Sequence, residues 1–142
     1  MSNIVTQLCT IVDCTRDYFK TDVGKKKLKL LDNIKNTRDP SSGIESTFTG
    51  IIAQVIYNMS GFIAETRFTG EDVVVFKEDT LEELFRIELK AGVQDKETHW
   101  YTNGATQFHG THCIFMGPSG LIKKINPTCH KKVGDWVIGV LT

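Results

Sequence analysis

The sequence has no long apolar run. Its strongly apolar stretches, such as Ile51–Ile56 and Trp136–Leu141, are far shorter than the roughly 20 residues that a helix needs to cross a bilayer. The first residues, Met1–Gln7, lack the basic start and the apolar centre of a secretory signal peptide. We therefore expect a soluble protein that stays in the cytoplasm and has no membrane partner.

The sequence also lacks net charge, because 17 Lys and Arg residues balance 17 Asp and Glu residues. This balance argues against a protein that coats polyanions without selectivity. It is compatible with a nucleic-acid enzyme, since such an enzyme needs only a local basic face and its metal-holding carboxylates lower the net charge. The four cysteines, at positions 9, 14, 113 and 129, form no CxxC pair. Without an export signal, we expect all four to be reduced thiols.

No repeat or low-complexity segment interrupts the 142 residues, a length typical of one domain. The hydrophobic fraction of 40% and the charged fraction of 24% are close to the globular average and exclude wholesale disorder. A domain of this size buries enough surface to fold without a metal or a disulfide. We expect a single domain over residues 1–142, with a helical N-terminal element over 1–40 and a core over 43–142.

Helical periodicity of the apolar residues predicts three helices, over Asn3–Tyr18, Lys25–Ile34 and Gly43–Met59. The third is the clearest, because its apolar side chains fall on one face. Ser42 is followed three residues later by Glu45, a capping-box pattern that indicates the start of this helix.

Alternating or continuous apolar patterns predict strands in the second half of the chain. We expect a hairpin around Gly117–Gly120, formed by the fourth and fifth of these strands, and a last strand that is buried on both faces. The strands are expected over Phe62–Phe68, Asp72–Phe76, Leu84–Leu89, Thr111–Met116, Leu121–Ile125 and Trp136–Leu141. The order of elements predicts an α+β (α/β-like) fold with a central mixed β-sheet flanked by helices.

The most informative residues are Asp72, Glu88 and Lys90. Side chains two apart on a strand share a face, so Glu88 and Lys90 project together. If the Asp72–Phe76 and Leu84–Leu89 strands pair, Asp72 and Glu88 meet near one end of the pair. Two carboxylates form a hard oxygen site suited to Mg²⁺, and a neighbouring Lys can orient water and stabilise a phosphate. This is the equipment for metal-assisted hydrolysis of a phosphodiester.

This arrangement resembles the PD-(D/E)XK nuclease superfamily, which includes restriction endonucleases and Holliday-junction resolvases. The resemblance covers roughly residues 43–94 and implies a restriction-endonuclease-like core. It assigns Asp72 as the first acid, Glu88 and Lys90 as the Glu-x-Lys pair, Glu45 on the preceding helix as an auxiliary acid, and Gln94 as an accessory polar residue. The sequence departs from the family's name at Glu71, which stands where that name has Pro, and the residues after Lys90 do not read as a helix.

Simpler interpretations stay open for each of these residues. Glu88 and Lys90 fit a solvated strand face with a surface ion pair of little energetic value. Asp72 fits turn chemistry beside Gly70. Glu45 fits equally well as the capping partner of Ser42.

A second group of residues could bind Zn²⁺ in a structural site. No pair in this group has the usual two-residue separation, so a core or surface role is favoured over metal binding, and a thiol nucleophile lacks an orienting acid. The group comprises His109, His112, Cys113, Cys129 and His130.

Together these features predict a Mg²⁺-dependent endonuclease acting on DNA, with Asp72, Glu88 and Glu45 as metal ligands, Lys90 as the positioning cation, and Mn²⁺ as a substitute metal. A chain this short covers little DNA, so we expect a homodimer. Two lysine clusters, Lys25–Lys29 and Lys123–Lys132, could contact phosphates. The alternatives are a non-enzymatic α+β module that binds nucleic acid, nucleotide or protein, and an RNA or toxin-type nuclease of the same superfamily.

Overall fold

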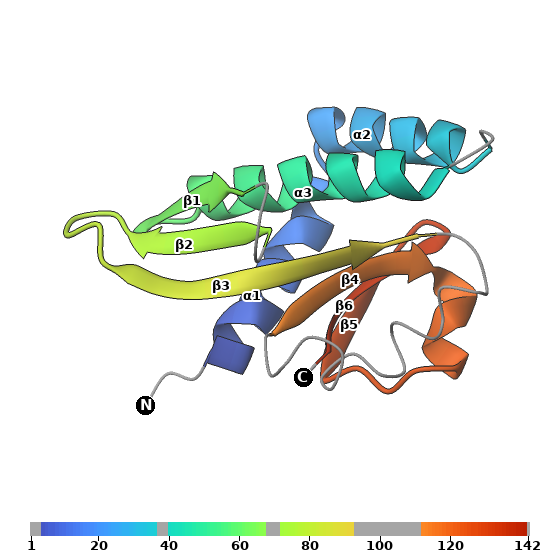
Figure 1. The fold of residues 1–142 in the computed structure, drawn as a ribbon. Helices are drawn as coiled ribbons and strands as arrows, with labels where there is room; N and C mark the ends of the chain where they lie inside the picture. The colour runs from blue at the N-terminus through green and yellow to red at the C-terminus, as the bar shows by residue number, and fades with distance from the viewer. Residues whose placement is uncertain (1–3, 37–39, 68–71, 93–111, 142) are drawn as a thin grey trace.

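A computed structural model describes residues 4–36, 40–67, 72–92 and 112–141 (Figure 1). Its first half is helical, as expected: α1 spans Ile4–Tyr18, α2 spans Asp22–Ile34 and α3 spans Pro40–Asn58. Helix α2 starts three residues before the predicted start, because the Thr21 side chain caps it by accepting a hydrogen bond from the backbone N–H of Gly24 at 3.0 Å.

Helix α3 begins at Pro40, which places Ser42 inside its first turn. A proline suits this position because the first turn of a helix needs no backbone N–H from it. The predicted capping box of Ser42 and Glu45 is therefore wrong, since Ser42 does not precede the helix. Glu45 lies in the helix itself and is half-buried.

The second half of the chain forms one mixed sheet of six strands in the order β1-β2-β3-β4-β6-β5. Strands β3 and β4 run parallel, and every other neighbouring pair is antiparallel. This confirms the α+β class and the mixed sheet. The strands are β1 (Phe62–Thr66), β2 (Val73–Lys77), β3 (Glu83–Ala91), β4 (Cys113–Pro118), β5 (Cys129–Val133) and β6 (Trp136–Leu141).

The predicted hairpin around residues 117–120 is wrong. The chain enters a short 3₁₀ helix, η2 (Ser119–Lys123), and β4 pairs with β6 instead. The apolar side chains of Leu121, Ile122 and Ile125 pack together onto the sheet, which a helical turn allows and an alternating strand does not. The actual hairpin joins β5 and β6, and Gly134 (φ +57°) takes the first position of its two-residue turn.

The two faces of the sheet are covered differently. A large core beneath the helices includes Leu89, Ile114 and Ile138, whereas a smaller cluster on the opposite face includes Phe115 and Val137. Every residue of β6 is buried, as predicted for a strand covered on both sides. Helix α2 packs outside α3, and η2 lies on the other side of the sheet (Figure 1).

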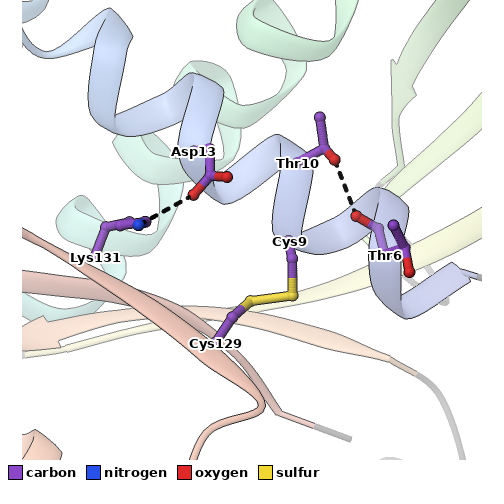
Figure 2. Close-up of a disulfide and its surroundings, with 6 residues drawn as sticks. All are labelled: Thr6, Cys9, Thr10, Asp13, Cys129 and Lys131. Atoms are coloured by element: carbon purple, nitrogen blue, oxygen red, sulfur yellow. Dashed lines mark hydrogen bonds and ion pairs between the residues drawn. A yellow bond between two sulfur atoms is a disulfide. The ribbon is translucent and has the colours of Figure 1, made fainter.

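A disulfide joins Cys9 of α1 to Cys129 of β5 across 120 residues of sequence (Figure 2). The expectation that all four cysteines are thiols is therefore wrong for this pair, while Cys14 and Cys113 are free. Spacing along the sequence carried no sign of the pair, because it is the packing of α1 on β5 that brings the two residues together.

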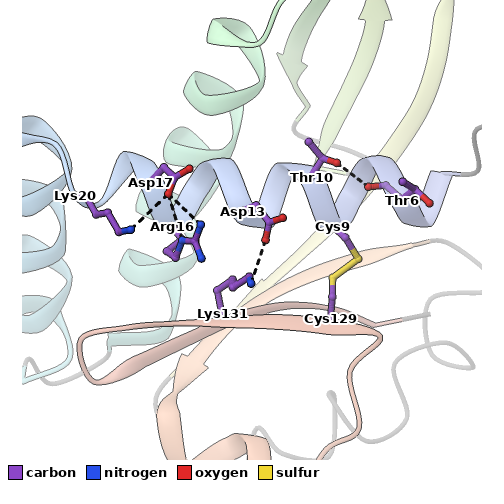
Figure 3. A network of polar contacts seen from close by, with 9 residues as sticks. All are labelled: Thr6, Cys9, Thr10, Asp13, Arg16, Asp17, Lys20, Cys129 and Lys131. Atoms are coloured by element: carbon purple, nitrogen blue, oxygen red, sulfur yellow. Dashed lines mark hydrogen bonds and ion pairs between the residues drawn. A yellow bond between two sulfur atoms is a disulfide. The ribbon is translucent and has the colours of Figure 1, made fainter.

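Further contacts along α1 are ionic (Figure 3). Asp13, one helical turn after Cys9, lies 3.7 Å from Lys131 of β5, and Asp17 contacts both Arg16 and Lys20. Since Cys129 and Lys131 are two residues apart on β5, both face α1. No helix within the described ranges is both long and apolar enough to span a membrane.

Candidate active site

Asp72 stands directly before β2, at the point where the β2–β3 ladder ends. The ladder pairs Val73 with Ile87, so one step further Asp72 lies opposite Glu88. Strand β2 begins at Val73, so its pairing with β3 ends here within the described residues. The Asp72 carboxylate takes over, with its Oδ2 accepting a hydrogen bond from the backbone N–H of Leu89 at 2.8 Å. The side chain of Asp72 thus supplies β3 with a hydrogen-bond acceptor just beyond the last backbone pair of β2 and β3.

Glu88 and Lys90 project from β3 on one face of the sheet, as their spacing predicts. Lys90 Nζ lies 3.8 Å from Glu88 Oε1, and the two side chains are only 22% and 21% exposed. On its other side, β3 is held by β4, because the backbone N–H of Glu88 donates to the carbonyl of His112 at 3.0 Å. Both functional groups therefore stand on a strand fixed along both edges.

The environment of Glu88 disfavours its charged form. Burial is the largest cause, and the neighbouring negative charge of Asp72 comes next; together with smaller contributions they raise the pKa of Glu88 to about 7. Lys90 opposes the rise in this pKa, whereas Glu45 and a hydrogen bond with Asp72 add to it. The three carboxyl groups therefore act on one another within a single, partly desolvated site.

Glu45 lies on α3, which packs on the helical face of the sheet. Its negative charge contributes, less than burial and Asp72 do, to raising the pKa of Glu88. The structure thus brings Asp72, Glu88 and Lys90 to one end of the β2–β3–β4 unit, whereas Glu45 is linked to them only by the effect of its charge on the pKa of Glu88. Gln94, the fifth candidate, lies outside the described residues.

Cys113 is a neighbour of the site that sequence reasoning did not place there. It lies beside Glu88 in the parallel β3–β4 register and is fully buried, and its Sγ contacts the carbonyl of Ile114 at 3.6 Å. Burial, and next the charge of Glu88, raise the pKa of the Cys113 thiol. Both effects favour the neutral thiol, which lies buried beside Glu88. Residues 92–112 separate strand β3 from its parallel neighbour β4. No local sequence pattern therefore predicts that Cys113 lies beside Glu88.

The predicted zinc group is not assembled. The sulfur of Cys129 is in the disulfide, Cys113 is buried in β4, and His130 is exposed on β5. His109 lies outside the described residues. Over the ranges that the structure describes, no three His, Cys, Asp or Glu side chains are grouped so as to hold a metal ion.

The donor chemistry of Asp72 and Glu88 nevertheless fits one particular class of ion. Mg²⁺ prefers oxygen ligands, keeps several waters, and in proteins is commonly held by one or two carboxylates together with phosphate oxygens. Two facing carboxylates at a partly exposed strand end match this requirement. They do not match Zn²⁺, which favours a closed set of nitrogen and sulfur ligands.

The site is therefore defined by the side chains of α3, β2 and β3 and by their mutual electrostatics. Comparisons of the chain with protein-family models, with curated proteins and with solved structures found no match.

Proposed function

We propose that this protein is a divalent-metal-dependent endonuclease that hydrolyses DNA phosphodiester bonds, built on a restriction-endonuclease-like core. The observation that carries the proposal is the meeting of Asp72 and Glu88 at the end of the β2–β3 ladder, with Lys90 at 3.8 Å from Glu88. The order of elements supports it as well, because α3 is followed by three strands and then by a parallel fourth, β4.

In this proposal Asp72 and Glu88 hold Mg²⁺, or Mn²⁺ in its place. The ion supplies charge neutralisation at the scissile phosphate and lowers the pKa of a water molecule. The Lys90 ammonium, beside Glu88, donates hydrogen bonds to a non-bridging phosphate oxygen and orients the attacking water. Glu45 acts on the same site as an auxiliary acid. The fixed backbone of β3 holds these groups in position before the substrate arrives.

The electrostatics of the site favour the binding of a cation. Glu88 is 21% exposed, and the negative charges of Asp72 and Glu45 act on it, while the Lys90 ammonium lies 3.8 Å away. Partly buried like charges are unfavourable unless an opposite charge accompanies them. Asp72 and Glu88 would hold a divalent cation, whose positive charge would offset this repulsion.

The burial of the Glu88–Lys90 pair speaks against the simplest alternative. A decorative ion pair on a solvated strand face, as expected for a binding module, leaves both side chains largely exposed. The Glu83–Arg86 pair on the same strand is an example of such an exposed ion pair, since its side chains are 44% and 45% exposed. Glu88 and Lys90 are about half as exposed.

Double-strand cleavage calls for two such sites, and we include a two-fold homodimer in the proposal. Its test is the molar mass in solution by light scattering, with and without a DNA duplex. A 1:1 complex with DNA would leave a single-strand nicking activity as the better account.

The central experiment is a cleavage assay on duplex, branched and single-stranded DNA and on RNA. Each substrate is tested in Mg²⁺, Mn²⁺ or EDTA with the wild type and with the variants Glu88→Gln and Lys90→Met. Glu83→Gln is the matched control, because it removes a carboxylate from the same strand outside the site. We expect metal-dependent cutting by the wild type and the control, with a loss of at least about a hundredfold in both site variants.

Absence of cutting on every substrate would overturn the proposal and favour the binding module. Cutting of RNA alone would assign the same site to a ribonuclease. Cutting that survives both Glu88→Gln and Lys90→Met would place the activity elsewhere in the chain.

A further inference from the structure

Positive charge is concentrated towards the C-terminus. Residues 98–142 contain four lysines and one acidic residue, Asp135, although the chain as a whole is neutral. The other lysine cluster, Lys25–Lys29, lies on α2. The two clusters look equivalent in the sequence, but the fold places Lys25–Lys29 on the helical side and divides the C-terminal lysines between the two faces of the sheet.

The strand register connects the candidate active site with β5. Lys90 lies beside Phe115 of β4, and Phe115 lies beside Gly139 of β6. Gly139 in turn lies beside His130 of β5. Residues that are partners in adjacent strands project on the same face, so Lys90 and His130 are the two ends of one row across the sheet.

Phe115 and Gly139 form the middle of this row. A Cβ on Gly139 would come within 2.7 Å of the Phe115 ring and 2.6 Å of the carbonyl oxygen of Cys129. The absence of a side chain at Gly139 thus leaves room for the Phe115 ring. The Phe115 side chain is fully buried in the small cluster, where Leu121 of η2 packs with it, so only the two ends of the row carry polar side chains.

Lys132 belongs to the same face. It pairs with Val137, which packs in the small cluster with Phe115, and its side chain is exposed. Its neighbour Lys131 points the other way, towards α1, where it lies 3.7 Å from Asp13 (Figures 2 and 3). Adjacent lysines of β5 therefore mark opposite faces of the sheet.

Helix η2 adds a further lysine to this face. Leu121 is buried against Phe115 and Val137, which fixes η2 over the small cluster. Lys123, the last residue of η2, is exposed. We call Lys123, His130 and Lys132 the C-terminal basic surface.

The α2 lysines lie on a helix that packs on the helical side of the sheet. Helix α2 packs on the outside of α3 (Figure 1). It also holds Trp136, whose indole N–H donates to Asp32 at 2.8 Å and whose ring lies 5.7 Å from Lys35 Nζ. Trp136 is packed in the core on the helical side of the sheet. Helix α2 therefore packs on the helical side of the sheet, whereas Glu88 and Lys90 project on the opposite face.

We propose that the C-terminal basic surface binds the phosphate backbone of the DNA whose scissile bond lies at Asp72, Glu88 and Lys90. This inference rests on the proposed function. It gives the direction in which the bound DNA extends from the site across the protein. Three strand spacings separate Lys90 from His130, about 14 Å. At about 3.4 Å per nucleotide along one strand of duplex DNA, the surface contacts phosphates about four nucleotides from the bond that is cut.

The test compares two variants that each lose two lysine charges. Lys123→Gln with Lys132→Gln alters the C-terminal basic surface, whereas Lys29→Gln with Lys131→Gln alters exposed or half-exposed lysines on the helical side. Binding of the full chain to a fluorescein-labelled DNA duplex is followed by anisotropy in EDTA over a range of salt concentrations. Circular dichroism and thermal unfolding confirm that both variants are folded.

We expect the first variant to reduce the slope of log affinity against log salt by about two, at roughly 0.9 per lost phosphate contact, and to weaken binding at least tenfold at low salt. The second variant should keep the wild-type slope. Equal slopes in both variants, or no binding of DNA by the wild type at low salt, would overturn the inference. DNA binding with the expected slopes but without metal-dependent cutting would overturn the nuclease proposal alone.

Discussion

The backbone N–H of Leu89 donates a hydrogen bond to the carboxylate of Asp72 at 2.8 Å, and this bond fixes the acid where strand β2 ends. Leu89 is itself fully buried in the core beneath the helices, between the two site residues of β3. The apolar side chain therefore anchors the strand on one face while the functional groups occupy the other. The position of Asp72 relative to Glu88 follows from backbone geometry.

The first prediction separates the two roles of Asp72. Asp72→Asn keeps an oxygen that can accept the Leu89 bond, so its free energy of unfolding should stay within about 1 kcal/mol of wild type. Asp72→Ala leaves that N–H without its partner and should cost about 1–3 kcal/mol. Both should lose metal-dependent cleavage. Urea denaturation and the cleavage assay measure the two effects, and full activity of Asp72→Asn would remove Asp72 from the metal site.

The second prediction concerns stability against pH without metal. The pKa of Glu88 is raised to about 7 in the folded state, mainly by burial, against an ordinary value of 4.5. Between these values the folded state keeps a proton that the unfolded chain has lost. The free energy of unfolding should therefore fall as the pH rises from about 4.5 to about 7, and level off above.

Glu88→Gln cannot release this proton, so urea denaturation in EDTA should show a smaller fall in its stability over this pH range. The matched control is Glu83→Gln. The pKa of Glu83 is lowered, first by its hydrogen bond with Arg86, so its loss should leave the fall between pH 4.5 and 7 in place. If the free energy of unfolding of Glu88→Gln falls as much as that of the wild type, the fall arises from another titrating group.

The third prediction is that metal and proton compete at Glu88. Because a ligating carboxylate must be deprotonated, the rise in melting temperature on adding Mg²⁺ should be larger at pH 8 than at pH 6. The rise should vanish in Glu88→Gln and persist in Glu83→Gln. Calorimetric or fluorescence-monitored melting measures it, and an equal rise in all three proteins would indicate nonspecific binding of the ion.

Much of the site could be predicted because it depends on short-range rules. Glu88 and Lys90 share a face because strands have a period of two. Asp72 and Glu88 meet because consecutive strands commonly pair, and here β2 and β3 do so in antiparallel register. The mixed sheet followed from the order of helical and strand patterns.

The rest depends on contacts between distant segments. Nothing local indicates that Cys113 lies beside Glu88, since β4 returns to β3 only after residue 112. The spacing of the apolar residues Leu121 and Ile125 is compatible with a strand and with a helical turn. The helical turn forms because it lets both side chains pack on the sheet. Cys9 and Cys129 come together through the docking of α1 on β5, which spacing does not show.

The last prediction tests the link between α1 and β5. A cross-link between Cys9 and Cys129 closes a loop across a sequence separation of 120 residues, and in the chain-entropy account such a loop stabilises the folded state by roughly 3–5 kcal/mol. Cys9→Ser with Cys129→Ser should unfold at lower urea than the oxidised wild type, and a reductant should abolish the difference. Cys14→Ser, which alters a free thiol of the same helix, should keep the response to reductant. Thiol titration of the unfolded, unreduced protein should count two groups, Cys14 and Cys113; a count of four would show that the cross-link is absent, and α1 would then be held on β5 by packing and the Asp13–Lys131 contact alone.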